Sequence, residues 1–258
     1  MLERDELVAY VNQALNIRAF AGSDYCPNGL QVSGKQAIQK VVTGVTSNLA
    51  LIESAVQAQA DVLLVHHGFF WKNEDPTIVG MKQKRLKCLL ASEINLLVYH
   101  LPLDYHPVWG NNAQLAKLLG IELRGPLEAG NSLSIGNIGV LKHPESAPKS
   151  VEEFRQKIAT TLNRDPLFIS GGEHLIQSVG ICTGAAQHAI HQAVAQNMDA
   201  YITGEVSENT VHVAREMGIH FFACGHHATE RYGVQALGEH LASHFGIEHE
   251  FIDIDNPV

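Results

Sequence analysis

The sequence lacks any apolar segment long enough to form a membrane helix. Its longest apolar runs, such as residues 62–65 (VLLV), are far shorter than the roughly 20 residues that span a bilayer. The opening residues, MLERDELVAY, lack the apolar core behind a basic stretch that marks a secretory signal. We therefore expect a cytoplasmic protein without a membrane segment.

Runs of basic residues are also missing. The chain has 18 lysines and arginines against 27 aspartates and glutamates, and its formal net charge is −9. Because proteins that grip a phosphate backbone usually carry a basic face, nucleic acid is not an expected partner. A small anionic ligand stays compatible with this charge if bound metal supplies a local positive field.

Paired cysteines are absent as well. The four cysteines, Cys26, Cys88, Cys182 and Cys224, are scattered and form no C-x-x-C pair. This spacing favours free thiols in a reducing compartment over a disulfide framework. Cys224 lies within an apolar segment, where a small core residue is the better interpretation than a nucleophile.

Two common catalytic motifs do not occur. The sequence contains no G-x-x-x-x-G-K-[ST] phosphate loop and no G-x-S-x-G nucleophile motif. Gly171-Gly172 is an isolated pair without a nucleotide-binding pattern around it. A P-loop nucleotide site and an α/β-hydrolase are therefore not expected.

Short apolar strands alternate with helices along the 258 residues, 45% of which are hydrophobic. The expected strands of the first half cover residues 40–46, 61–67 and 94–100, and the expected helices lie at 3–16, 48–60, 83–93 and 111–120. This alternation predicts an α/β fold with mainly parallel or mixed sheets flanked by helices.

The second half repeats the plan of the first. A shift of 138 residues places residues 40–46 (KVVTGVT) on 178–184 (SVGICTG) and Asp61 on Asp199, and a shift of 126 places His100 on His226. We predict an internal duplication with lobes at 1–125 and 126–258, whose last helix and strand pack across the boundary. The residues from 125 to 163 are expected to form a hairpin and a helix of the second lobe.

Polar residues follow the expected strands of both halves. His66 and His67 end one strand, and His226 follows another with Glu230 four residues further on, a spacing that places both side chains on one face of a helix. Asp104 stands in the same relation to His100, but Pro102 argues for a loop there.

The carboxyl ends of parallel strands meet at one crevice, and imidazole and carboxylate suit Zn, Mn, Fe, Co or Ni. On a regular strand adjacent histidines point to opposite faces, so a turn eased by Gly68 would let each reach a different ion. Ten more of the 15 histidines are expected to be structural or surface residues: His106, His143, His174, His188, His191, His212, His220, His240, His244 and His249.

Several long motifs resemble one protein family. They are V-H-H-G-F-F-W-K, Y-H-L-P-L-D-x-H with G-N-N-A-Q-L-A, I-T-G-E-V-S-E, G-H-H-A-T-E-R-x-G, the early P-N-G-L-Q-V and the final F-I-D-I-x-N-P. Together they cover essentially the whole chain and resemble the NGG-interacting-factor-three-like family. Its short bacterial members are often labelled type-two homologues of GTP cyclohydrolase I.

The resemblance implies a two-lobed subunit in a ring-shaped homohexamer with a dinuclear metal site between the lobes. The implied ligands of two divalent ions per subunit are His66, His67, Asp104, His226 and Glu230. His100 and Glu205 flank them as candidate general acid or base residues.

Such a centre suits metal-dependent hydrolysis of a small nucleotide-like anion, including opening of a purine ring. The alternative is a ring that holds metal as a non-catalytic scaffold or regulator. A nucleic-acid-binding ring is disfavoured by the charge.

Overall fold

The computed structural model describes residues 2–141 and 150–258. The chain forms two compact units, the first made of Met1–Trp109 and Gly233–Asp255 and the second of Gly110–Tyr232 and Asn256–Val258. Most of the last helix and the last strand lie in the first unit, as expected, but the boundary falls after residue 109 and not after residue 125. Within the described residues, no helix has the length and apolar character needed to cross a membrane.

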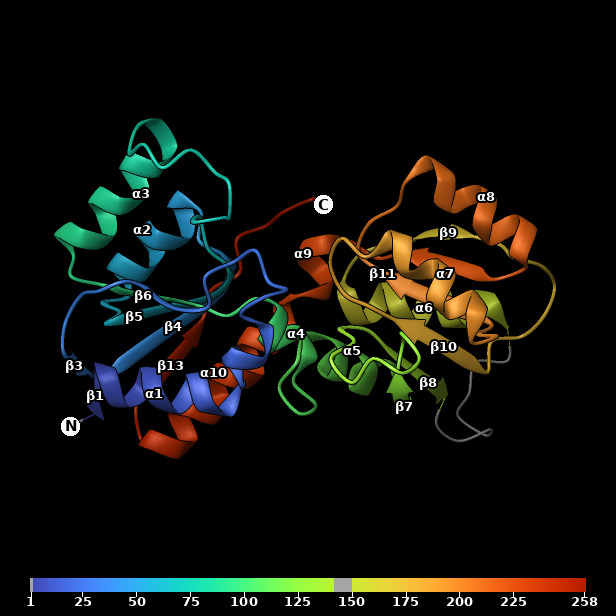
Figure 1. Cartoon of the computed structure of the whole chain (residues 1–258), viewed down its shortest axis with the longest axis horizontal. Coiled ribbons are helices and arrows are strands. Elements are labelled where there is room, and N and C mark those ends of the chain that lie inside the picture. The colour runs from blue at the N-terminus through green and yellow to red at the C-terminus, as the bar shows by residue number, and fades with distance from the viewer. Residues whose placement is uncertain (1, 142–149) are drawn as a thin grey trace. The chain divides into compact units, whose positions relative to one another are not determined.

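A five-stranded mixed sheet forms the centre of the first unit (Figure 1). Its strands, in spatial order, are β13 (Glu248–Phe251), β4 (Lys40–Thr46), β5 (Val62–His67), β6 (Asn95–Val98) and β2 (Gly29–Val32). All neighbours are parallel except β2 and β6, which are antiparallel. The parallel pairing of β13 with β4 explains why Gly233–Asp255 belongs to this unit. A short ladder joins β1 (Leu2–Glu3) to β3 (Ala37–Ile38).

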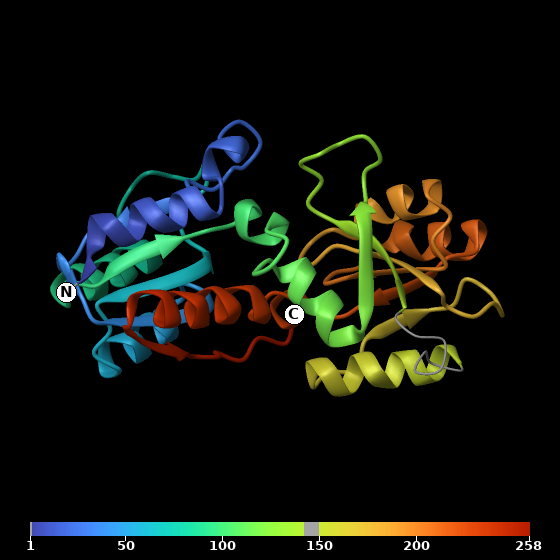
Figure 2. The same ribbon diagram turned by 90° about the horizontal axis from the view of Figure 1, so that it is seen from below.

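Helices cover both faces of this sheet. They are α1 (Arg4–Ala14), η1 (Ile17–Phe20), α2 (Leu49–Gln57), α3 (Gly80–Ala91), α4 (Leu101–Tyr105) and α10 (Arg231–Phe245). Figure 2 shows α1 and α10 over the same side of the sheet, and α2 and α3 cover the other side. The apolar run of β5 follows from this arrangement: Val62 and Leu64 pack toward α1 and α10, and Leu63 and Val65 toward α2 and α3. Burying each of these side chains contributes roughly 1.5–3 kcal/mol.

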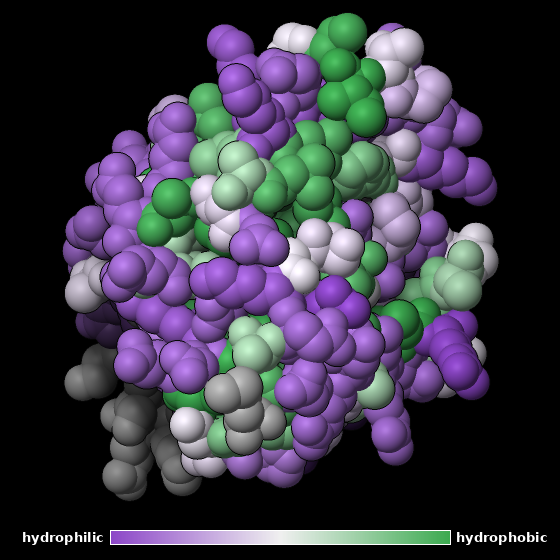
Figure 3. Space-filling model, turned by 90° about the vertical axis from the view of Figure 1, so that its left-hand side faces the viewer, coloured by the Kyte–Doolittle hydropathy of each residue, from purple (hydrophilic) through white to green (hydrophobic). Residues whose placement is uncertain are grey.

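The surface seen in Figure 3 is mostly hydrophilic, with one larger hydrophobic area among the polar side chains. Exposed apolar side chains of the first unit include Ile78, Val79, Met81 and Leu90, which lie in and just before α3.

A six-stranded mixed sheet forms the centre of the second unit. Its strands, in spatial order, are β7 (Ile121–Pro126), β8 (Asn137–Leu141), β10 (Ser178–Ile181), β11 (Ala200–Thr203), β12 (His220–Ala223) and β9 (Leu167–Ile169). The three strands β10, β11 and β12 are parallel, and β7, β8 and β9 run antiparallel to their neighbours. The expected hairpin is β7 with β8, and the expected helix that follows it is α6 (Val151–Leu162), so both predictions are confirmed.

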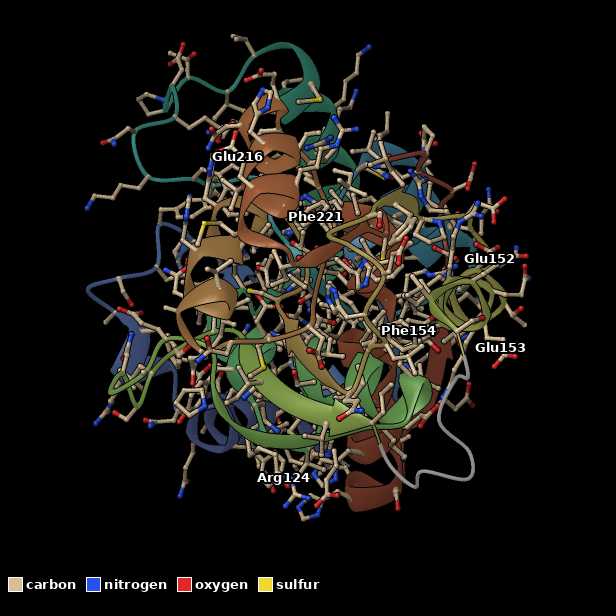
Figure 4. The ribbon with its side chains drawn as sticks, turned by 90° about the vertical axis from the view of Figure 1, so that its right-hand side faces the viewer. Arg124, Glu152, Glu153, Phe154, Glu216 and Phe221 are labelled. Carbon is tan, nitrogen blue, oxygen red and sulfur yellow. The ribbon has the colours of Figure 1, made fainter. Side chains whose placement is uncertain are left out.

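Two layers of helices enclose this second sheet: α5 (Asn111–Leu119) and α6 on one side, η2 (Gln187–Ala189), α7 (Ile190–Ala195) and α8 (Glu208–Met217) on the other. The short α9 (His226–Thr229) follows β12. Figure 4 shows Phe154 of α6 and Phe221 of β12 inside the unit, and both are fully buried. Phe154 meets Phe222 edge to face at 5.6 Å, whereas the neighbouring Glu152 and Glu153 point outward (Figure 4). The alternation of apolar and charged residues on α6 therefore matches its one buried side.

The two units begin their parallel strands in the same way. Asp61, just before β5, accepts hydrogen bonds from the backbone N–H groups of Gln39 and Lys40 at 2.9 and 3.1 Å. Asp199, just before β11, accepts them from Gln177 and Ser178 at 2.9 and 2.8 Å. Each aspartate thus satisfies backbone donors at the start of the neighbouring strand.

Candidate metal centre

His66 and His67 end the central strand of the first unit. His66 is completely buried and His67 is partly exposed, and their ring centroids lie 4.5 Å apart. The strand continues through His67, which pairs with Thr46, so no turn separates the two histidines. Gly68 follows the end of the strand, and a Cβ there would lie 2.5 Å from Oε1 at the end of the Gln31 side chain.

Each of these two rings is anchored through Nδ1. The Nδ1–H of His66 donates to the backbone oxygen of Tyr99 at 2.9 Å, and Nδ1 of His67 lies 3.1 Å from Oγ1 of Thr46. In a neutral imidazole the other nitrogen then carries the lone pair, so Nε2 of His66 is its ligand atom.

Asp104 lies on a helix, which corrects the expectation of a loop. The helix is α4, and Pro102 occupies its first turn. Proline is tolerated there because the N–H groups of a first turn have no partner within the helix. Asp104 is buried, and its Oδ2 lies 3.5 Å from Nε2 of His66.

His100 stands at the N-terminal end of α4 and joins the two histidines of β5. The ligand atoms of His66, His67 and His100 all lie within 4.8 Å of one another, a grouping that could hold a metal ion. The Nδ1–H of His100 donates to Oδ1 of Asp24 at 2.9 Å, and its backbone N–H donates to Oδ1 of Asn28 at 2.7 Å. Burial alone would raise the pKa of Asp24, but the bonds from His100 and Asn28 outweigh it and lower that pKa.

His226 and Glu230 form the second group, within the second unit. The helix α9 begins at His226, and Glu230 follows its last residue, so the spacing of four brings Nε2 and Oε2 to 3.1 Å. The Nδ1–H of His226 donates to Oε1 of Glu205 at 2.7 Å. Burial alone would lower the pKa of His226, but Glu230 and Glu205 together raise it to about 9.

Gly184 leaves the space in which Glu230 lies. It adopts φ +72°, a conformation that favours glycine, and a Cβ there would overlap the Glu230 carboxylate and lie 3.3 Å from Nε2 of His226. Its N–H donates to Oγ1 of Thr229 at 3.1 Å, which fixes it against α9.

The donor atoms fit a divalent ion. Two ligand atoms about 2.1 Å from one ion lie about 3.0 Å apart at a right angle and about 3.4 Å apart at a tetrahedral angle. The pairs His66–Asp104 at 3.5 Å and His226–Glu230 at 3.1 Å have this separation. Both pairs combine imidazole with carboxylate, and each imidazole is held through its other nitrogen, as in metal sites generally.

The structure therefore brings His66, His67, His100 and Asp104 together in the first unit, and His226, Glu230 and Glu205 in the second. Sequence reasoning missed Asp24, Thr46 and Gly184. Asp24 lies just before the P-N-G-L-Q-V motif, in a Gly/Pro/Asn loop that carried no periodic signal. Gly184 could not be identified from the sequence, because only its short distance from Glu230 in the folded structure shows that a larger side chain would not fit.

Several histidines assigned to structural or surface roles have such roles. His220 accepts the N–H of Gly171 and stacks on His174 at 4.2 Å, and His212 pairs with Glu208 on the exposed face of α8. His143 lies outside the described residues. All four cysteines are free, as predicted, and Cys224 is fully buried, which raises the pKa of its thiol.

The fold and these groups define an α/β protein with mixed sheets and with histidine, aspartate and glutamate clusters that could hold metal. The family model of Duf34/NIF3 (NGG1p interacting factor 3) matches residues 2–257, so the chain belongs to this family.

Relatives and solved structures agree with this membership. Proteins named GTP cyclohydrolase 1 type 2 homolog are 56% identical in Haemophilus influenzae, covering 98% of both chains, and 49% identical in Escherichia coli, covering 100% of both. A solved structure titled protein ybgI, of unknown function, matches with a TM-score of 0.92 at 49% identity over 100% of both chains. A second one, from Thermus thermophilus, matches with a TM-score of 0.88 at 32% identity, again over 100% of both.

Proposed function

We propose that the protein is a metal-dependent hydrolase that acts on a small nucleotide-like substrate and holds two divalent ions. The ligands of these ions are His66, His67 and Asp104 from the first unit and His226 and Glu230 from the second. Relatives named GTP cyclohydrolase 1 type 2 homolog support a reaction of the cyclohydrolase kind.

The observation that carries the proposal is the shared anchoring of the histidines. His66, His100 and His226 each donate Nδ1–H to an oxygen atom of their own unit, which directs the lone pair of Nε2 elsewhere. In His66 and His226 a carboxylate oxygen lies 3.5 and 3.1 Å from Nε2, the distance expected between two ligands of one ion. A carboxylate facing Nε2 of a ring whose Nδ1–H is already hydrogen-bonded is typical of a metal ligand and not of a purely structural histidine.

A bound divalent ion supplies Lewis-acid activation of water and of the electrophile. The side chains of the chain do the rest. Glu205 holds the tautomer and orientation of His226, and Thr46 orients the ring of His67. His100, backed by the Asp24 carboxylate, can hold a proton at Nε2 and pass it to a leaving group, which makes it the general acid or base of the proposed reaction.

The two units are proposed to be copies of one ancestral α/β unit. The matching aspartates, Asp61 and Asp199, and the three parallel strands at the centre of each sheet support this origin. Each copy would supply part of one dinuclear centre, since neither group alone offers enough donors for two ions. A ring-shaped homohexamer remains proposed on the family resemblance, and sedimentation velocity of the purified protein tests it.

Metal analysis and a substrate screen test the function. The purified protein should contain up to two Zn, Mn, Fe, Co or Ni ions per chain. With each ion restored in turn, it should consume at least one nucleotide or related heterocycle above the background of Glu230→Ala. Stoichiometric metal without turnover of any such compound would contradict the hydrolase and leave a non-catalytic metal-binding scaffold as the function.

A further inference from the structure

A cavity of about 590 Å³ lies in the first unit, which is within the usual size of small-molecule sites. The loop after η1 and the segment after β5 form its walls. The backbone joins these two segments, because the N–H of Lys72 donates to the oxygen of Tyr25 at 2.9 Å. The proposed metal ligands are not among the described residues that line this cavity, so it offers additional binding surface.

One wall of the cavity is aromatic. The rings of Tyr25 and Trp71 lie 5.3 Å apart at 37°, and Tyr25 is 54% exposed. Because the two rings already contact one another, a planar ligand would stack on their outer faces and not between them. A solvent-exposed tyrosine beside a tryptophan is a stacking platform of the kind that binds nucleobases.

This aromatic wall borders the histidines. The ring of His100 meets Tyr25 at 5.2 Å and Trp71 at 5.5 Å, in both cases edge to face. His67 lies 6.1 Å from Trp71. A ring stacked on the wall would therefore sit next to the donors of the proposed metal centre.

The cavity is also lined by cations that have no carboxylate partner. Asp24 is engaged by His100, and Glu74 lies 3.7 Å from the ammonium of Lys82. Among the described residues, Arg18 and Lys72 form no ion pair, although both line the cavity. A guanidinium and an ammonium at one cavity favour a phosphate or a similar anion.

We propose that this cavity binds a nucleoside monophosphate or a close analogue, with the base stacked on Tyr25 and Trp71 and the phosphate held by Arg18 and Lys72. The inference deepens the proposed function and rests on it for the reaction. It implies that the heterocyclic ring, and not the phosphate, lies beside His100, so the bond that breaks belongs to the ring.

Tryptophan fluorescence tests the binding directly. The chain has two tryptophans, so Trp109→Phe leaves Trp71 as the reporter. The probes are adenosine and guanosine 5′-monophosphate, compared with the nucleosides alone and with ribose 5-phosphate. We expect saturable quenching by at least one monophosphate, and at least tenfold weaker binding of the matching nucleoside and of the sugar phosphate. Titrations of protein treated with a chelator should give the same order of affinities for the three kinds of probe, because the proposed metal ligands do not line the cavity.

Three exposed positions supply the variants. Tyr25→Leu should weaken monophosphate binding by roughly 5- to 150-fold, the usual effect of losing one stacking platform, whereas Tyr25→Phe should bind as the parent does. Arg18→Gln with Lys72→Gln should weaken the monophosphate and leave the nucleoside unchanged. Absence of saturable quenching, or equal binding by Tyr25→Leu and the parent, would overturn the proposal.

The same variants separate this inference from the proposed function. Binding that depends on Tyr25 without any turnover contradicts the hydrolase and supports the nucleotide site. Turnover with a KM unaffected by Tyr25→Leu supports the hydrolase and contradicts the nucleotide site.

Discussion

His226 and Glu230 face one another across the single turn of α9, with 3.1 Å between Nε2 and Oε2. The other nitrogen of the His226 ring is also bound, because its Nδ1–H donates to Oε1 of Glu205 at 2.7 Å. One imidazole thus lies between two carboxylates, and the geometry gives them different roles. Glu230 shares the proposed metal with the ring, whereas Glu205 orients it.

Replacing Glu230 should remove metal from the protein. Glu230→Ala takes away a carboxylate ligand and leaves His226 alone on α9, so we expect the metal content per chain to fall by at least one equivalent. Elemental analysis of the purified variant measures this loss.

The chain provides a matched control for this variant. His212 and Glu208 form the same four-residue pair, at 2.8 Å, on the exposed face of α8. Glu208→Ala should leave the metal content unchanged. Equal metal in Glu230→Ala and Glu208→Ala would refute the assignment of Glu230 as a ligand.

Replacing Glu205 should weaken metal binding without removing a ligand. Loss of a partner that orients a ligating histidine typically costs 10–100-fold in affinity, and we expect Glu205→Gln to fall in this range. Competition with a chromophoric chelator measures the change. A variant with the affinity of the parent would show that Glu205 has no part in the centre.

The same variant has a second readout in the metal-free protein. Burial lowers the pKa of His226, and Glu230 and Glu205 raise it to a net value of about 9. Glu205→Gln removes one of the two raising charges, so the pKa of His226 should fall. NMR titration of the imidazole checks this direction.

The α/β fold could be predicted from the sequence because β5 and its neighbours are continuous apolar runs buried on both faces. The candidate site residues could be identified from the sequence for the same reason, since they directly follow these apolar runs. Pro102 predicts a loop at Asp104 because proline breaks the interior of a helix, but the first turn of a helix accepts proline. The sequence predicts that the last helix and strand pack across the boundary between the lobes. It does not predict a boundary after residue 109, because no local pattern in residues 110–125 reports which sheet this segment joins.

A methyl group at Gly184 should disrupt the centre from outside the ligand set. In Gly184→Ala the new Cβ would overlap the Glu230 carboxylate, so Glu230 must move and metal affinity should fall by at least tenfold. Isothermal titration of the metal-free variant with Zn²⁺ measures this loss.

Gly130→Ala is a control that distinguishes the effect of the overlap with Glu230 from the effect of backbone strain. Gly130 has a similar positive φ, +82°, but nothing lies within 4 Å of the position of its Cβ. Both variants therefore carry the strain of an alanine at positive φ, roughly 1 kcal/mol of stability. Only Gly184→Ala should lose metal affinity, and equal affinities in the two variants would argue against the contact with Glu230.

Asp61 should make the stability of the first unit depend on pH. Burial alone would raise its pKa, but the N–H groups of Gln39 and Lys40 and the ammonium of Lys35 hold the pKa below its ordinary value. A carboxyl whose folded pKa is depressed stabilises the fold fully above its unfolded pKa, near 3.9, and loses this contribution as the pH falls through the folded value. At pH 7, Asp61→Asn keeps the shape and removes the charge, and we expect it to cost about 1–3 kcal/mol.

Urea unfolding from pH 7 to pH 3 measures this dependence. The difference in unfolding free energy between the parent and Asp61→Asn should be constant down to about pH 4.5 and shrink below pH 4, because the parent then takes up the proton that the variant cannot bind. Asp165→Asn, at an exposed position, should follow the parent at pH 7. If the curves of Asp61→Asn and the parent stay parallel down to pH 3, the hydrogen bonds at the start of β4 do not depend on the charge of Asp61, and the pH dependence must arise elsewhere in the chain.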